Sequence, residues 1–142
     1  MREILFKAKS IEYGEWIEGI PIKTHLGLFI SFEENPHYCS QYGYMEIDDI
    51  LMVDEKTLCK FTGLYDKRGN KIWENDILMA HLDDLYPEDT TYETIEWGVA
   101  GWVAHEANSI DGQYLDEFDL EYFEVVGNIF DNPELLQEES DE

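Results

Sequence analysis

Short stretches of alternating hydrophobic and polar residues recur along this chain, and glycine, proline, asparagine or aspartate separates them. Residues 15–19 show the alternation, and residues 26–32 form a more apolar stretch that ends before Pro36. Such stretches, bounded by turn-forming residues, are typical of strands in antiparallel sheets. The pattern predicts strands at residues 4–6, 15–19, 26–32, 64–65, 71–73, 77–80, 94–104 and 122–130, and residues 47–53 are again apolar. We therefore expect a mainly β fold, an α+β arrangement with little helix.

Two segments carry the signals of short helices, and one carries those of a hairpin. Asp54 can accept hydrogen bonds from the first N–H groups of a helix, and Gly63 can adopt the left-handed conformation that ends one. We therefore predict a short helix between these two residues. A second short helix is predicted after Asn132-Pro133, with the proline at its first position. Gly69-Asn70 suits the positive φ angles of a hairpin turn.

Length and composition indicate a folded protein. The chain has 142 residues, of which 44% are hydrophobic and 14% aromatic, enough for one domain or two small lobes with a buried core. No apolar run approaches the roughly 18 residues that a membrane helix requires. The first seven residues are too short and too mixed for a signal peptide. The expected location is the cytoplasm, without membrane contact.

Charge divides the chain into two very different parts. The net formal charge is −24, and all nine Lys and Arg residues lie at or before Lys71. Residues 1–71 carry a net charge of −3, whereas residues 72–142 contain 21 Asp and Glu and no Lys or Arg. This negative charge repels a phosphate backbone and disfavours direct nucleic-acid binding by the C-terminal half. Two explanations stay open: a solvated face that confers solubility, or a surface that docks on a basic patch of a partner.

Four sequence blocks place aromatic, glycine and asparagine residues in a recognisable order. They are Arg2-x-Ile4-x-Phe6-Lys7-Ala8 and residues 14–19, 60–77 and 124–136. Together these blocks resemble the YopX-like family of small phage and prophage proteins. The chain departs from the usual family pattern at Lys7, Cys59-Lys60 and Asn75, where Arg, Gly-Gln and Gly are more common. We expect an unusual backbone angle at Asn75, because Asn tolerates such angles better than most residues.

The resemblance implies a mostly β fold whose C-terminal half is a small SH3-like barrel. Residues 1–142 then form a single YopX-like unit, with an N-terminal β lobe at 1–60, the barrel half at 61–136 and an acidic tail at 137–142. A phage or prophage origin in a Gram-positive host is also implied, which would place the protein in the cytoplasm of the phage-bearing bacterium. The resemblance implies no activity, catalytic residue or cofactor.

No motif in the sequence matches known catalytic or metal-binding chemistry. The four histidines lie far apart without metal-ligand spacing, and Cys39 and Cys59 fit neither a zinc site nor a redox motif. A phosphate-binding loop, a dinucleotide fingerprint and a nucleophile elbow are all missing. Adjacent carboxylates are frequent because the composition is acidic, and none follows the EF-hand pattern. We therefore expect no enzymatic activity, no metal and no cofactor.

Three sets of residues are candidates for contact with a partner. The first is a tyrosine cluster, the second a pair of cations on the predicted hairpin, and the third consists of acidic pairs in the C-terminal half. These residues are Tyr38, Tyr42 and Tyr44; Lys67 and Arg68; and Asp83, Asp84, Asp116, Glu117 and Asp119. Burial of the tyrosines and solvation of the turn are the simpler explanations. Trp73, Trp97 and Trp102 lie in strand-like stretches and are expected in the core.

The sequence favours a small acidic accessory protein that binds an unknown protein partner through its C-terminal half. One alternative is nucleic-acid mimicry, in which the acidic face occupies the cleft of a DNA-handling enzyme. A nucleic-acid-binding module that uses the cations before residue 72 is less favoured, and an enzyme is the least favoured function. The oligomeric state stays open.

Overall fold

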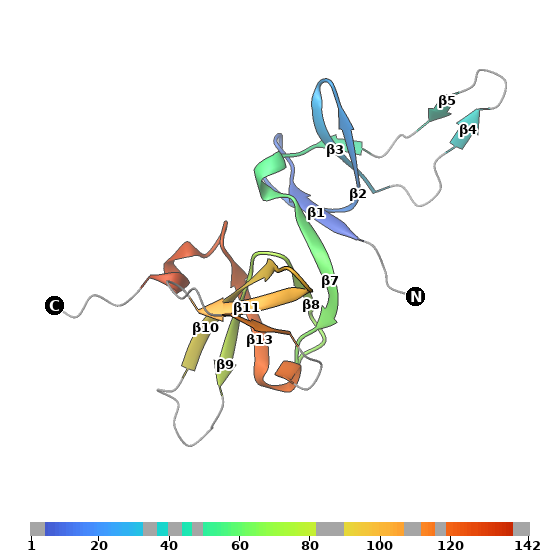
Figure 1. The fold of residues 1–142 in the computed structure, drawn as a ribbon. Coiled ribbons are helices and arrows are strands. Elements are labelled where there is room, and N and C mark those ends of the chain that lie inside the picture. Colours follow the sequence, from blue (N-terminus) through green and yellow to red (C-terminus); the bar gives the residue numbers. More distant parts are fainter. Residues whose placement is uncertain are drawn as a thin grey trace. The chain divides into compact units, whose positions relative to one another are not determined.

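The computed structural model describes residues 5–32, 37–39, 44–46, 50–81, 90–106, 112–115 and 119–137 (Figure 1). The chain divides into two units, Met1–Lys60 and Phe61–Glu142. Within the described ranges the regular elements are β-strands and short 3₁₀ turns. The mainly β fold expected from the alternation of residues is confirmed. The described residues include no helix of the length and hydrophobicity needed to cross a membrane.

The first unit is built on an antiparallel sheet. Its strands are β1 (Phe6–Lys9), β2 (Trp16–Thr24), β3 (Gly27–Ser31) and β6 (Ile50–Met52), while β4 (His37–Cys39) pairs separately with β5 (Tyr44–Glu46). The order in the sheet is β6-β3-β2-β1. Alternate residues of the central strands face a core of Ala8, Leu28, Ile30 and Val53. The period of two in the sequence thus reflects one buried and one open sheet face.

The chain passes between the units within β7 (Cys59–Tyr65). Cys59 and Lys60 pair with β1, whereas Phe61 and Tyr65 pair with β8 (Lys71–Trp73) across a bulge. The helix predicted between Asp54 and Gly63 is therefore wrong beyond its first turn. Asp54 does accept the N–H of Lys56 at 3.0 Å, but it caps only the 3₁₀ turn η1 (Glu55–Thr57).

Strand pairing explains why that helix ends so early. Pairing with β1 and β8 buries Cys59 and Phe61, two residues apart on β7, which a helix would place on different faces. Gly63 does have a positive φ angle of 84°, as expected from its position, but it lies in the β7 bulge and not at a helix end.

The second unit is a five-stranded antiparallel sheet with the order β12-β11-β10-β9-β13. Its strands are β9 (Asp76–His81), β10 (Thr90–Trp97), β11 (Trp102–Glu106), β12 (Gly112–Tyr114) and β13 (Phe123–Asn128). The 3₁₀ turns η2 (Asp119–Tyr122) and η3 (Pro133–Leu136) flank β13. The buried core consists of Ile72, Leu78, Ala80, Ile95, Ala104 and Phe123.

The single strand predicted at residues 94–104 is wrong, because the chain reverses there. The N–H of Gly98 donates to the carbonyl of Gly101 at 2.7 Å, and Trp97 pairs with Trp102. The two glycines form a hairpin turn between β10 and β11 and not a kink within one strand. A Cβ at Gly98 would lie 2.6 Å from Val103 Cγ2, so this position has no room for a side chain.

Candidate functional site

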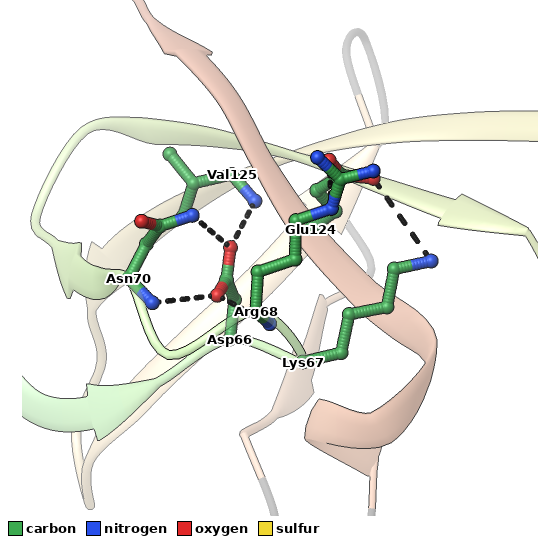
Figure 2. Close-up of polar contacts among 6 residues, drawn as sticks. All are labelled: Asp66, Lys67, Arg68, Asn70, Glu124 and Val125. Carbon is green, nitrogen blue, oxygen red and sulfur yellow. Dashed lines mark hydrogen bonds and ion pairs between the residues drawn. The ribbon is translucent and has the colours of Figure 1, made fainter.

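The turn that joins β7 to β8 is organised by one carboxylate, that of Asp66 (Figure 2). Asp66 Oδ1 accepts the N–H groups of Arg68 and Asn70 at 2.9 and 2.8 Å, and Oδ2 accepts the side-chain amide of Asn70 at 3.2 Å. Gly69 has a φ angle of 83°, as its place in the predicted hairpin turn requires. An aspartate that bonds to the following backbone is a common means of closing a tight turn.

The same carboxylate connects the turn to a strand far along the chain. Asp66 Oδ2 also accepts the N–H of Val125 in β13 at 2.9 Å (Figure 2), and the N–H of Lys67 donates to the carbonyl of Phe123 at 3.2 Å. Only 6% of Asp66 is exposed. Because the N–H groups of β13 on this side would otherwise lack strand partners, the turn completes the hydrogen bonding of that edge.

These contacts change the acidity of Asp66. Burial of its carboxyl group acts to raise the pKa, whereas the N–H groups of Val125, Asn70 and Arg68 stabilise the charged form and lower it. The hydrogen bonds dominate, so the pKa of Asp66 lies below its ordinary value. Asp66 is therefore an ionised structural anchor at neutral pH and not a proton donor.

The two predicted hairpin cations lie beside a carboxylate of β13 (Figure 2). Arg68 Nε is 2.9 Å from Glu124 Oε1, and Lys67 Nζ is 3.9 Å from Glu124 Oε2. The Glu124 side chain is mostly buried, while that of Arg68 is mostly exposed. Because Glu124 lies within ion-pair distance of both cations, the turn is not an uncompensated basic patch. The proposed contact role of Lys67 and Arg68 stays a prediction.

The corner between β8 and β9 uses the same kind of polar chemistry. Asp76 Oδ2 accepts the N–H of Trp73 at 2.8 Å, and Asp76 is buried. Asn75 has a φ angle of 69°, which confirms the unusual backbone angle expected at this position. Its N–H donates to Ile95 and its carbonyl accepts from Ile129. The corner therefore fixes both β10 and the segment after β13.

The end of β13 forms a third polar turn. Asn128 Oδ1 accepts the N–H groups of Phe130 and Asp131 at 3.0 and 2.9 Å, while its own N–H donates to Asn132 Oδ1 at 3.3 Å. A Cβ on Gly127 would lie 2.3 Å from that Asn132 oxygen, so only glycine fits there. The short helical turn predicted after Asn132-Pro133 is present as η3, with Asn132 at its N-cap, although the Asn132 side chain makes no cap hydrogen bond to η3.

In the described part of the chain, a pocket and one small group of polar side chains on the sheet of the second unit are candidate sites for chemistry. A shallow pocket of about 250 Å³ lies at the start of β10, and its lining residues are Thr90, Thr91, Tyr92, Glu106, Leu135, Leu136 and Gln137. His105 Nε2 lies 3.1 Å from Glu96 Oε2 and 3.4 Å from Thr94 Oγ1 on the sheet. Among described residues, no three His, Cys, Asp or Glu side chains are grouped closely enough to hold a metal.

Most of the predicted partner-contact residues lie outside the described residues or have side chains outside the described set. Five of them lie outside the described residues, namely Tyr42, Asp83, Asp84, Asp116 and Glu117. For three others the structure describes the backbone alone, namely Tyr38 in β4, Tyr44 in β5 and Asp119 in η2. Their contact roles stay predictions.

The tryptophans show where sequence reasoning missed a surface feature. Trp73 is buried as expected, but the core position predicted for Trp97 is wrong, because 59% of this residue is exposed. Trp97 and Trp102 face each other across the β10–β11 hairpin, with ring centroids 4.9 Å apart at 74°. The spacing Trp-Gly-x-x-Gly-Trp could have indicated a hairpin whose tip projects beyond the core.

Comparison with known proteins gives two findings. The sequence model of the YopX protein family matches residues 7–137. The fold is similar to the crystal structure of protein EF1440 from Enterococcus faecalis, with a TM-score of 0.68 and 22% sequence identity. That likeness covers 96% of this chain and 100% of the other chain, and at this identity it supports a shared fold alone. A search of curated proteins found no match.

Proposed function

This chain belongs to the YopX protein family, and we propose that it is a phage or prophage accessory protein that binds another protein through its acidic C-terminal half. The observation that carries the proposal is the division of charge. Residues 72–142 have a net charge of −21, and all Lys and Arg residues precede them. A surface of one sign attracts a partner of the opposite sign and accelerates the encounter.

The described acids of this half support such an encounter because several are open to solvent. Glu96, Glu106, Glu121, Asp131 and Glu134 are exposed, in contrast to the buried Asp76. An exposed carboxylate remains hydrated and ionised, so it can attract a basic partner without a large loss of folding stability. The partner in this proposal presents Lys and Arg side chains, and both proteins lie in the cytoplasm of the bacterial host.

The proposed role is non-catalytic and uses no cofactor. The polar residues of the family-like blocks are engaged in backbone hydrogen bonds, as Asp66, Asp76 and Asn128 illustrate. Side chains that close turns are not available to hold or activate a substrate. Because the characteristic polar residues of these blocks stabilise turns, they favour a protein that binds a partner through its surface over one that catalyses a reaction.

The experiment is affinity capture from host lysate at about 50 mM and about 500 mM NaCl, with charge-neutralised variants of the full chain. One variant replaces four exposed acids of the C-terminal half by their amides, at Glu106, Glu121, Asp131 and Glu134. The matched control makes the same change at four exposed acids of the first unit, at Glu12, Glu15, Glu18 and Asp54. We expect a partner that is lost at high salt and with the first variant but retained by the control. Equal capture by both variants would contradict the proposal.

Nucleic-acid mimicry is a special case of the same proposal, supported by the same lack of cations after residue 71. It requires the captured partner to be a DNA-handling enzyme and requires double-stranded DNA to compete with this chain for it. A partner that binds this chain and DNA simultaneously would exclude mimicry and leave ordinary protein binding.

A further inference from the structure

The tip of the β10–β11 hairpin exposes an apolar cluster in an otherwise acidic half. We define the aromatic tip as Trp97, Val99 and Trp102. Trp97 is 59% exposed and Val99 is fully exposed. Trp102 is half-buried and packs partly against the core of the second unit. Large apolar side chains are usually buried, so an exposed tryptophan that packs against a second tryptophan beside an exposed valine indicates a contact surface.

The backbone around the aromatic tip is fixed by strand pairing. Trp97 opposes Trp102 on one face of the hairpin, whereas Val103 opposes Tyr114 of the neighbouring β12 on the other face. A Cβ at Gly98 would lie 3.6 Å from Tyr114 Cε1, which places the tyrosine ring against the turn. Because these groups are already ordered, a partner that contacts them loses little additional conformational freedom on binding.

The residue types of the aromatic tip are those that dominate binding energy. Tryptophan and tyrosine are enriched among the few interface residues whose truncation costs the most, and they act when a pocket removes them from water. The edge-to-face arrangement of Trp97 and Trp102 presents one ring outward while the other connects to the core. A projecting cluster of this kind fits a concave apolar pocket.

The net charge of the half that contains the aromatic tip selects the kind of partner. No Lys or Arg follows residue 71. A second copy of this chain would bring its own net charge of −24 to the contact, which opposes self-association. Nucleic acid could stack on the rings, but its phosphates would meet the same repulsion.

We propose that the aromatic tip inserts into an apolar pocket, rimmed by Lys and Arg side chains, on a protein partner. This inference rests on the proposed function and names the part of the acidic half that contacts the partner. The acids provide long-range attraction, and the apolar side chains provide contact area that persists after docking.

The test uses point variants of the full chain in the same capture assay, with the partner quantified by mass spectrometry. Val99→Asn removes apolar surface from a fully exposed turn residue, and Trp97→Ala removes the exposed ring. The matched control is Leu26→Asn, since Leu26 is 68% exposed in the turn between β2 and β3 of the first unit. Urea unfolding of each variant establishes that the fold is retained.

We expect affinity for the partner to fall about tenfold with Val99→Asn and at least about 30-fold with Trp97→Ala, while Leu26→Asn binds as wild type does. A benzophenone side chain at position 99 should cross-link to partner peptides that contain Lys or Arg beside apolar residues, and one at position 26 should not. Both results together support the inference.

Three outcomes would overturn it. If both tip variants keep the partner while the four-acid variant loses it, the aromatic tip is not the anchor, although the proposed function stands. If sedimentation shows a dimer that Val99→Asn dissociates, the occupant is a second copy. If wild type captures no partner at either salt concentration, the proposed function fails together with this inference.

Discussion

Replacement of Asp66 by asparagine tests whether one carboxylate holds the β7–β8 turn against β13. The carboxylate accepts four hydrogen bonds, three from the backbone N–H groups of Arg68, Asn70 and Val125 and one from the Asn70 side chain. The introduced asparagine has a single amide oxygen, which would retain at most two of them, and its NH₂ group would face the remaining donors. The substitution thus removes at least two hydrogen bonds to a charged group.

The expected loss follows from the strength of such bonds. Each hydrogen bond to a charged group contributes about 1.5–3 kcal/mol. In the variant, the N–H groups of the turn that lose the carboxylate can bind water instead, which offsets part of this loss. We therefore expect Asp66→Asn to lower the free energy of unfolding by about 2–4 kcal/mol. That is a large fraction of the stability of a small protein, which is about 5–15 kcal/mol.

The effect should also depend on pH. Because the pKa of Asp66 is lower in the folded chain than in the unfolded chain, its stabilising contribution is complete above the unfolded value of about 3.9. The contribution decreases as the pH falls through the folded pKa and the carboxylate becomes protonated. The stability difference between wild type and Asp66→Asn should therefore narrow below about pH 4.

Urea unfolding followed by tryptophan fluorescence measures both effects, since urea does not screen charges as guanidinium does. The matched control is Asp54→Asn, which removes the same charge from an exposed cap with one backbone hydrogen bond. Asparagine caps about as well as aspartate, so its cost should be below about 0.5 kcal/mol. The reasoning is refuted if the two variants differ by less than about 1 kcal/mol, or if the effect of Asp66→Asn is the same at about pH 3 as at neutral pH.

Three further substitutions test the other turns by urea unfolding. Gly127→Ala should lower the free energy of unfolding by about 1–3 kcal/mol because its Cβ would overlap Asn132 Oδ1. Adding Asn132→Ala to that variant should recover part of the loss, and strictly additive effects of the two substitutions would exclude the clash. Asn75→Ala should lower the free energy of unfolding by about 1 kcal/mol, because alanine is strained at the positive φ angle of this position. Asn75→Gly should lower it less, and the reverse order would show that backbone strain is not the cause. Arg68→Ala removes an exposed partner of Glu124, so it should lower the free energy of unfolding by less than about 1 kcal/mol, and by nothing in about 1 M NaCl. A larger loss that does not depend on salt would show that the Arg68 side chain also contributes packing contacts.

Local sequence was a good guide where side-chain type and near neighbours decide the structure. The apolar stretch at 26–32 became β3, and the positive φ angles of Gly69 and Asn75 follow from the residues that occupy those turns. The signals around Asp54 were also locally correct, since it does cap a turn. Only the predicted length of that helix was wrong, because the chain enters strand β7 at Cys59 and pairs there with β1 and β8.

The candidate site was less predictable because its contacts join distant segments. Lys67 and Arg68 were identified as a basic hairpin tip, but their carboxylate partner Glu124 follows more than fifty residues later. Nothing in the local pattern distinguishes Glu124 from the other acids of this chain. Trp97 was likewise assigned to the core from its strand-like neighbours, although the chain reverses one residue later.

By itself the sequence determined the division of charge, the mainly β fold and the chemistry of the turns. These depend on which residues are present and on neighbours a few positions away. Only the tertiary structure decided that Asp66 is a buried anchor and that Trp97 is exposed at a hairpin tip. Burial and hydrogen-bond partners depend on which strands meet, and that is set by pairing between residues such as Asp66 and Val125, far apart in the chain.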